Sequence, residues 1–247
     1  MNKSKMNSLL SNTWNTWIKN PIILLVLSLI CTGLLFLKNS SYSVDSEWVS
    51  NSQEWYMFST ITVISYLLLS NTIYYIIDES KAQTLKKLKI SNLLNVKTLT
   101  IILVQIPHLV IISNLYAILD FFSVSLQYAI IINVVMLIIS SIAMSIFKLN
   151  YMFIDGSMKE CTAISIRIIK NYASCLLVIA CVWGIVYYFN FSIGHLFEDY
   201  PDIIQIISFV SVFLIHSFYK VFMYELFIDF HENNTQDNDI TKHIISE

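Results

Sequence analysis

The sequence predicts an all-α membrane protein with six membrane-spanning helices. Hydrophobic residues make up 56% of the 247 residues, only 13% are charged, and the mean hydropathy is +0.64. A soluble domain has about a quarter of its residues charged. The charged residues of this chain also cluster between long apolar segments. This distribution is typical of a polytopic membrane protein rather than of a large soluble core.

Six apolar segments are long enough to cross a bilayer, which takes about 20 residues in a helix. The predicted spans are about 21–37, 55–77, 98–122, 126–147, 172–191 and 203–228. The first span is preceded by residues 1–20 and is followed by no cleavage pattern of small residues. We therefore interpret it as an anchor rather than as a signal peptide.

The two ends of the chain are more polar than the six-span domain, which covers residues 21–229. Residues 1–20 carry apolar side chains at helical spacing between Lys, Asn and Ser. The apolar residues are Leu9, Leu10, Trp14, Trp17 and Ile18. This pattern predicts an amphipathic helix on the inner membrane surface, and a lead-in without regular structure is the alternative. Residues 230–247 are expected to form a polar, mobile cytoplasmic tail.

The positions of lysine and arginine predict the orientation, because cytoplasmic loops are enriched in both. With both termini inside, 13 of the 15 basic residues lie in cytoplasmic segments and Lys38 lies outside. The inside residues are Lys3, Lys5, Lys19, Lys81, Lys86, Lys87, Lys89, Lys97, Lys148, Lys159, Arg167, Lys170 and Lys242. Lys220 lies near the inner end of the last span, where its side chain can reach the interface. With an odd number of spans, the basic residues would no longer lie mainly on one side of the membrane.

The same composition excludes several other classes of protein. A net charge of −2 gives no reason to expect nucleic acid as a partner. The chain has only four glycines and no G-x-x-x-x-G-K-[ST] sequence, so it is not expected to bind ATP itself. It has no C-x-x-C or H-E-x-x-H sequence, and its four cysteines are expected to be reduced thiols rather than disulfides or metal ligands. No acid–base or nucleophile constellation predicts an enzyme.

The loop between the second and third spans has features that topology alone does not require. Residues 81–97 contain five of the 15 basic residues. Ser80 and Gln83 form an S-x-x-Q capping box, which predicts a helix that begins at Lys81. A loop that merely holds positive charge inside the cell would need no such cap.

The predicted helix has an acidic beginning and a small apolar ridge. Asp78 and Glu79 lie at its N-terminal end, where the helix dipole favours negative charge. Leu85 and Leu88 are three residues apart and therefore share a face. The segment thus predicts a short cytoplasmic helix that docks against a soluble partner, and a loop that only fixes topology is the alternative.

This loop resembles the corresponding loop of ABC type-2 exporter permeases. The shared features are Asp78-Glu79, Ala82, Thr84-Leu85, the basic and apolar residues Lys86 to Lys89, Ser91 and Lys97. The Gly that usually precedes Thr-Leu is replaced by Ala82-Gln83, and the Pro that usually follows Ser by Asn92. Six spans, cytoplasmic termini and a surface helix before the first span are also similar, so the resemblance covers the whole chain.

The resemblance implies a permease that is coupled to a separate ATPase. In the family this loop is the coupling helix, and the residues it implies here are Asp78, Glu79, Lys81, Thr84, Leu85 and Leu88. Two ATPase subunits would bind the ATP and Mg, and this chain would carry no cofactor of its own. A second permease, either identical or a sister chain, would complete the assembly.

The loop from Lys148 to Lys170 is the second cytoplasmic segment that the resemblance assigns to the ATPase. The candidate contact residues are Asp155, Lys159 and Arg167. Asp155-Gly156-Ser157 is expected to form a turn. On the residues alone, a cytoplasmic extension of the fifth helix explains the rest of this segment equally well.

The candidates for lining a transport pathway are aromatic or histidine residues within the spans. They are Tyr66, Tyr74, His108 and Tyr187. Contacts with lipid or between helices are the alternative for each of them. The spans contain no ladder of charges of the kind that an ion-coupled transporter uses.

The apolar wall suits an amphipathic or lipid-like cargo. The short loops resemble the permeases of Gram-positive exporters for bacteriocins and peptide toxins. We therefore expect a permease in a bacterial plasma membrane that moves an amphipathic peptide. The alternative is a membrane immunity or sensor protein that binds a peptide without an ATPase.

Overall fold

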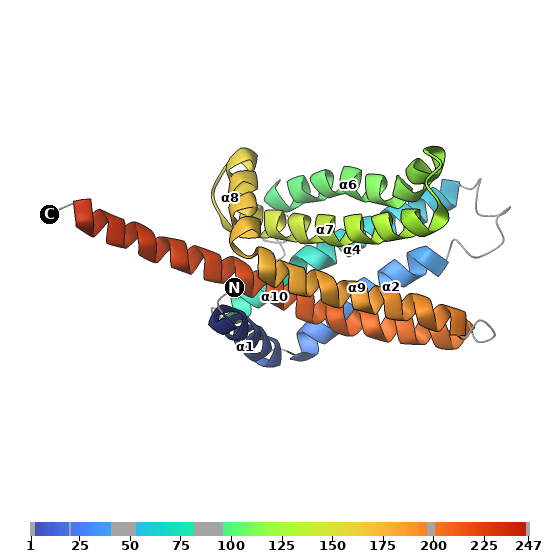
Figure 1. Ribbon diagram of the computed structural model, residues 1–247, viewed down its shortest axis with the longest axis horizontal. Helices are drawn as coiled ribbons and strands as arrows, with labels where there is room; N and C mark the ends of the chain where they lie inside the picture. Colours follow the sequence, from blue (N-terminus) through green and yellow to red (C-terminus); the bar gives the residue numbers. More distant parts are fainter. Residues whose placement is uncertain (1–2, 20, 41–52, 82–95, 197–200, 246–247) are drawn as a thin grey trace.

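The computed structural model describes residues 3–19, 21–40, 53–81, 96–196 and 201–245, and these residues form eight helices and no strand (Figure 1). The helices are α1 (Lys3–Lys19), α2 (Pro21–Ser40), α4 (Gln53–Lys81), α6 (Val96–Phe121), α7 (Leu126–Phe153), α8 (Met158–Asn171), α9 (Ala173–Leu196) and α10 (Pro201–Ile245). The predicted all-α class is confirmed for this part of the chain. Each of the six apolar segments coincides with one long helix, because a backbone in lipid must satisfy its hydrogen bonds within the segment.

Three helices are long and apolar enough by themselves to cross a membrane. Within the described residues these are Thr60–Glu79 of α4, Ile131–Phe153 of α7 and Phe209–Asn233 of α10. Two sharply bent pairs, α1 with α2 and α8 with α9, raise the number to five if each pair is counted as one span. The fold therefore has three to five candidate spans, and the full set of six stays a prediction.

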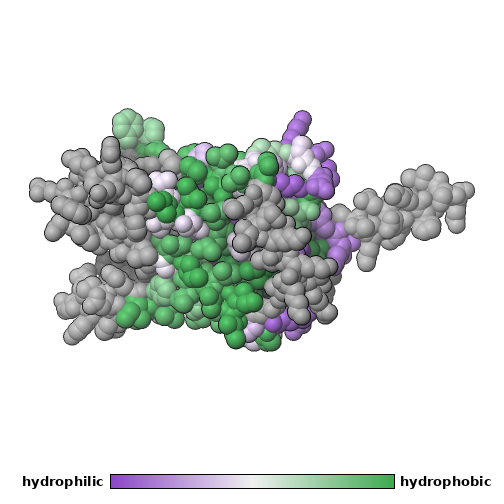
Figure 2. Space-filling view, turned by 180° about the vertical axis from the view of Figure 1, so that it is seen from behind, coloured by the Kyte–Doolittle hydropathy of each residue, from purple (hydrophilic) through white to green (hydrophobic). Residues whose placement is uncertain are grey.

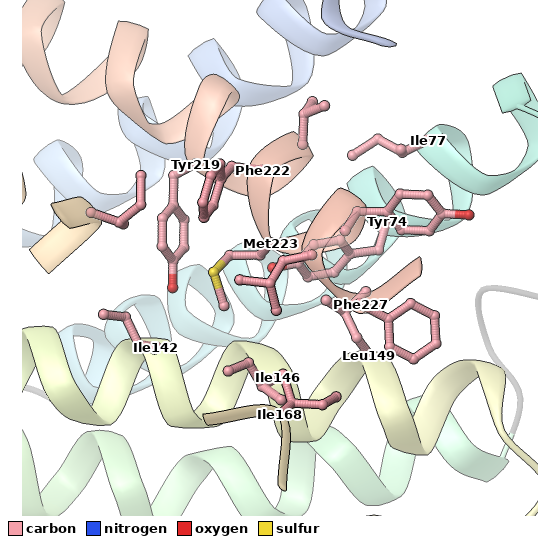
Figure 3. Packing of buried hydrophobic residues seen from close by; sticks show 14 of the residues in the cluster. Tyr74, Ile77, Ile142, Ile146, Leu149, Ile168, Tyr219, Phe222, Met223 and Phe227 are labelled. Carbon is pink, nitrogen blue, oxygen red and sulfur yellow. The ribbon is translucent and has the colours of Figure 1, made fainter. Parts of the chain in front are cut away.

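Helix α10 is the centre of the bundle. It packs against α1, α2, α4, α7 and α9, while α6 packs mainly against α7 at the outside of the bundle (Figure 1). Figure 3 shows Tyr219, Phe222, Met223 and Phe227 of α10 packed with Tyr74 and Ile77 of α4 and with Ile142, Ile146 and Leu149 of α7. In lipid, close packing of this kind holds helices together, because the hydrophobic effect between them is absent.

The outside of the bundle is apolar over most of its length. Exposed apolar side chains include Ile22 and Val26 on α2, Leu103 and Ile111 on α6, Ile131 and Ile139 on α7, Leu177 and Ile185 on α9, and Ile206 and Leu214 on α10. Figure 2 shows hydrophobic residues across the middle of one face and hydrophilic residues gathered at the α8 end. Soluble monomers rarely expose so large an apolar surface, whereas a membrane protein presents it to lipid.

Several predicted boundaries differ from the structure. Helix α4 continues without a break through Ser80 to Lys81, so the prediction that a new helix begins at Lys81 is wrong. Helix α7 continues six residues past Phe147, the predicted end of its span, and α10 continues as a helix through the predicted tail to Ile245. In each case helix propagation extends past the apolar segment, because adding a residue to a formed helix is easier than starting a new one.

The three residues between the predicted spans 98–122 and 126–147 form a tight turn between α6 and α7. The backbone N–H of Val124 donates to the carbonyl oxygen of Leu119 over 3.1 Å. Ser123 has a φ of 56°, in the left-handed region that residues other than glycine rarely adopt. The turn places α6 and α7 side by side as an antiparallel pair.

Candidate functional site at the α8 end of the bundle

A single lysine joins the start of α6 to the turn that precedes α8. The Nζ atom of Lys97 donates to Oδ1 of Asp155 over 2.8 Å and to the carbonyl oxygen of Ile154 over 3.1 Å. This hydrogen bond, together with the positive charge of Lys97, holds the pKa of the Asp155 carboxyl below its usual range. The sequence assigns these two residues to different loops, and the structure brings the loops together.

Helix α8 begins at a capping box that is not among the predicted features. The backbone N–H of Glu160 donates to Oγ of Ser157 over 3.3 Å, and Oε2 of Glu160 accepts from the Ser157 backbone N–H over 2.7 Å. The Ser157 hydroxyl also donates to Oε2 over 2.9 Å. The bond from the Ser157 backbone N–H, and to a smaller extent the bond from its hydroxyl, hold the pKa of the Glu160 carboxyl below its usual range. The S-x-x-E pattern is visible in the sequence and would have predicted this helix start.

Helix α8 is a separate amphipathic helix rather than a straight extension of the fifth span. It meets α9 at Tyr172 with a bend of 82°. Cys161, Ser165 and Ile168 are buried on its inner face. Its exposed residues are Met158, Lys159, Glu160, Thr162, Ala163, Ile166, Arg167, Lys170 and Asn171. Asp155, in the turn before α8, is also exposed, so the three predicted contact residues Asp155, Lys159 and Arg167 all lie on the surface.

Asn150 fixes the position of α8 and was not singled out in the sequence. Its side chain is fully buried, and Nδ2 donates to Oγ of Ser165 on α8 over 3.0 Å. Its Oδ1 lies 3.2 Å from Nε2 of His231 on α10. Asn150 thus links α7, α8 and α10. Ser165 and His231 are 15 and 81 residues away from Asn150 along the chain, and contacts at such separations leave no recognisable pattern in a single sequence.

The predicted coupling segment is only partly visible. Asp78 lies in the last turn of α4, where it accepts a hydrogen bond of 2.5 Å from the Tyr224 hydroxyl on α10. Glu79 is partly buried beside it. The side chain of Lys81 and the residues Thr84, Leu85 and Leu88 lie outside the described part of the structure. Asp78 therefore joins α4 to α10, and the remaining coupling residues stay predictions.

Helix α1 is attached along α10 and has an apolar outer stripe. The Thr16 hydroxyl donates to Oε1 of Glu225 over 2.6 Å. Met6, Leu9, Thr13 and Thr16 are buried on its inner side, and Leu10, Trp14 and Ile18 are exposed at intervals of four residues. The stripe fits the predicted amphipathic surface helix, since a helix on a membrane turns one apolar face to the lipid.

A second set of contacts holds the beginning of α1. Lys5 lies 3.7 Å from the carboxylate of Asp229, and its Nζ atom is 4.0 Å from the centre of the Tyr172 ring. The Tyr172 hydroxyl also donates to Asp229. The start of α1, the α8–α9 bend and α10 therefore meet at the α8 end of the bundle.

The pathway candidates lie between helices where they are described. The ring of Tyr66 is partly buried, 6.5 Å from the ring of His216. Tyr74 is fully buried against α10. The side chains of His108 and Tyr187 lie outside the described part of the structure. Whether any of the four lines a pathway stays a prediction.

Lys220 does not reach the interface as the sequence predicts. Its side chain is buried, and Nζ donates to Oγ of Ser70 on α4 over 2.7 Å. The same atom lies 4.8 Å from the centre of the Tyr74 ring. The ammonium group is stabilised inside the bundle by the hydroxyl of Ser70 and the ring of Tyr74, and the side chain therefore does not extend to water.

The described residues contain no group of three or more His, Cys, Asp or Glu side chains placed to hold a metal ion. All four cysteines are free. Comparison with protein-family models, curated proteins and solved structures found no match for this chain. The class that the fold defines is an all-helical protein with three to five candidate membrane spans.

Proposed function

We propose that the chain is the permease subunit of an ATP-driven exporter of the ABC type-2 class, with ATP hydrolysis carried by separate subunits. The observation that supports this most directly is the contact between Lys97 and Asp155. It joins the end of the predicted coupling segment 78–97 to the beginning of the second predicted docking segment. One soluble partner at the α8 end would therefore contact both.

The exposed face of α8 suits such a partner chemically. It combines the positive charges of Lys159 and Arg167 with the apolar side chains of Met158 and Ile166. Apolar residues next to arginine are common at the centres of protein interfaces. A soluble subunit with an acidic and apolar groove is the complementary surface.

The contacts of α8 would carry a displacement into the bundle. The bend at Tyr172 connects α8 to α9, and the hydrogen bond between Asn150 and Ser165 connects it to α7. The contact between Asp78 and Tyr224 connects the end of α4 to α10. When ATP brings two ATPase subunits together, a movement of α8 would shift the long helices relative to one another.

The proposed assembly contains two permeases and two ATPase subunits in a bacterial plasma membrane. Each permease would have six spans and cytoplasmic termini. The exposed apolar faces leave room for lipid and for a second permease, either identical or a sister chain. The cargo would be amphipathic, as a bacteriocin or peptide toxin is, or lipid-like.

Charge reversal on α8 tests this proposal. The chain would be co-expressed with the genes that neighbour its own, purified in mild detergent and assayed for bound ATPase. We expect the wild-type chain to retain the ATPase and the double variant Lys159→Glu/Arg167→Glu to lose it. The control is Lys19→Glu, which reverses an exposed charge on α1.

Two results would reject the exporter proposal. The first is a wild-type chain that never retains an ATPase. The second is an α8 double variant that retains as much ATPase as the Lys19→Glu control. Either result would favour a peptide-binding immunity or sensor protein.

A further inference from the structure

Two lysine side chains are buried in the bundle with no carboxylate partner among the described residues. Lys148 on α7 is 4% exposed and Lys220 on α10 is 3% exposed. Within the part of the chain that the structure describes, the ion pairs join Lys5 to Asp229 and Lys97 to Asp155. Neither buried ammonium takes part in them. A buried charge is strongly unfavourable unless a partner of opposite charge compensates it.

The two lysines lie at the same level of the bundle. The Tyr219 hydroxyl on α10 donates to Oγ of Ser145 over 3.1 Å and to the carbonyl oxygen of Ser141 over 3.2 Å, which fixes α10 against α7. Lys220 follows Tyr219, and Lys148 lies three residues after Ser145 on the same face of α7. The bond between Tyr219 and Ser145 therefore brings the two buried lysines to the same part of the contact between α7 and α10.

The surroundings supply polar groups that can bind an anion. His216 lies one turn before Lys220, is buried, and has no hydrogen-bond partner on either ring nitrogen. Its ring also lies 6.5 Å from the ring of Tyr66, one turn before Ser70 on α4. Ser70 already contacts Lys220 over 2.7 Å. Two ammonium groups, an imidazole and a hydroxyl can all donate to one oxyanion.

We propose that Lys148 and Lys220, together with His216 and Ser70, bind the carboxylate or phosphate head group of an anionic amphiphile. Lys148 lies in the candidate span Ile131–Phe153 and Lys220 in Phe209–Asn233, so a ligand that reaches them is at membrane depth. An acyl chain would keep such a ligand among the apolar helices, while its head group neutralises the two lysines. The site does not rest on the proposed export function.

The first experiment uses the full chain purified in a neutral detergent. Dodecanoate and dodecyl phosphate are the anionic probes, and dodecyltrimethylammonium is the charge control. We expect both anions to bind and to raise the thermal-unfolding midpoint, and the cation to have no such effect. We expect Lys148→Met and Lys220→Met each to weaken anion binding by about 30-fold or more, as the loss of one partner of a buried charge pair does.

Two controls separate loss of the site from loss of the fold. Lys159→Met makes the same substitution at an exposed position of α8 and is expected to bind like the wild type. Methionine is close to lysine in size, and it removes an uncompensated buried charge. The variants are therefore expected to unfold at a temperature no lower than that of the wild type without ligand. Anion binding that is equally tight in both methionine variants and the wild type overturns the proposal.

A second experiment distinguishes a bilayer phospholipid from a single-chain amphiphile as the source of the head group. Phosphatidylglycerol retained by the detergent-purified chain is counted by mass spectrometry, before and after addition of dodecanoate. Retention that is lost in Lys220→Met and resists dodecanoate supports a bilayer phospholipid. Displacement by dodecanoate supports a single-chain amphiphile. Equal retention by Lys220→Met, with no binding of either single-chain anion to the wild type, overturns the proposal.

Discussion

Asn150 donates a hydrogen bond of 3.0 Å to the hydroxyl of Ser165, and this contact positions α8 across the end of α7. The asparagine is fully buried. We predict that Asn150→Ala destabilises the fold by about 1–3 kcal/mol, because Ser165 and His231 each lose a buried hydrogen-bond partner. Chemical unfolding in detergent measures the change.

The control for this prediction is Ser140→Ala on the same helix. Ser140 bonds only to the carbonyl oxygen of Leu137 within its own helix, at an exposed position. Its substitution should change the free energy of unfolding by less than about 0.5 kcal/mol. If the two variants unfold at the same denaturant concentration, Asn150 does not hold α8 in place.

The contact between Lys97 and Asp155 predicts a dependence of stability on pH. The hydrogen bond and charge of Lys97 lower the pKa of Asp155 in the folded state. A carboxyl with a lowered pKa stabilises the fold at pH values above its unfolded pKa, about 3.9, and this contribution is lost as the pH falls through the folded pKa. The difference in thermal midpoint between the wild type and Asp155→Asn should therefore shrink as the pH falls below about 4.

Lys97→Met removes the other half of the same pair and leaves the capping carboxylate of Glu160 in place. The difference in thermal midpoint between Lys97→Met and the wild type should depend on pH in the same way as the difference between Asp155→Asn and the wild type. If the difference in thermal midpoint between Lys97→Met and the wild type does not change as the pH falls, Asp155 does not stabilise the fold through its contact with Lys97.

The bond between Thr16 and Glu225 predicts that α1 can be loosened by one substitution. Thr16→Val keeps the shape of the side chain and removes a buried hydrogen bond of 2.6 Å to the Glu225 side chain, which contributes about 1–3 kcal/mol. We expect faster proteolysis within residues 3–19 and a red shift of tryptophan emission, since Trp14 and Trp17 lie on α1. The matched control is Thr162→Val, an exposed threonine on α8. Equal proteolysis of the two variants would contradict the prediction.

The turn between α6 and α7 predicts a stabilising substitution. Ser123 has a φ of 56°, which costs a residue with a Cβ atom about 1 kcal/mol relative to glycine. Ser123→Gly should therefore raise the free energy of unfolding by about that amount. Ser125→Gly, in the same turn but with a φ of −60°, should give no gain. Thermal unfolding of both variants checks the sign, and a gain in Ser125→Gly equal to that in Ser123→Gly would refute the backbone argument.

The long helices could be predicted from the sequence because each follows from local chemistry. An apolar segment of about 20 residues has few alternatives to a helix in lipid. Asp155-Gly156-Ser157 is read directly as a turn, and the structure confirms that these residues are not helical. The candidate contacts on α8 are exposed for the same local reason, because polar residues alternate with a narrow buried face.

The burial of Lys148 and Lys220 could not be predicted in this way. The positive-inside rule counts charges near a membrane surface and does not tell which side chains turn inward. The helix start predicted at Lys81 is wrong for a similar reason. Ser80 has the pattern with Gln83 but lies within the last turn of α4, whereas Ser157 and Glu160 follow a turn. Local sequence specifies a cap only where the preceding chain has left the helix.

The central place of α10 has a consequence for biosynthesis. The ribosome makes α10 after the seven other described helices, yet Thr16, Ser70, Asp78 and Ser145 on those helices all have bonds to it. Until α10 enters the membrane, these groups lack partners and the nascent bundle cannot close. A product that lacks α10 would therefore leave the hydroxyl groups of Ser70 and Ser145 without these partners between the remaining helices.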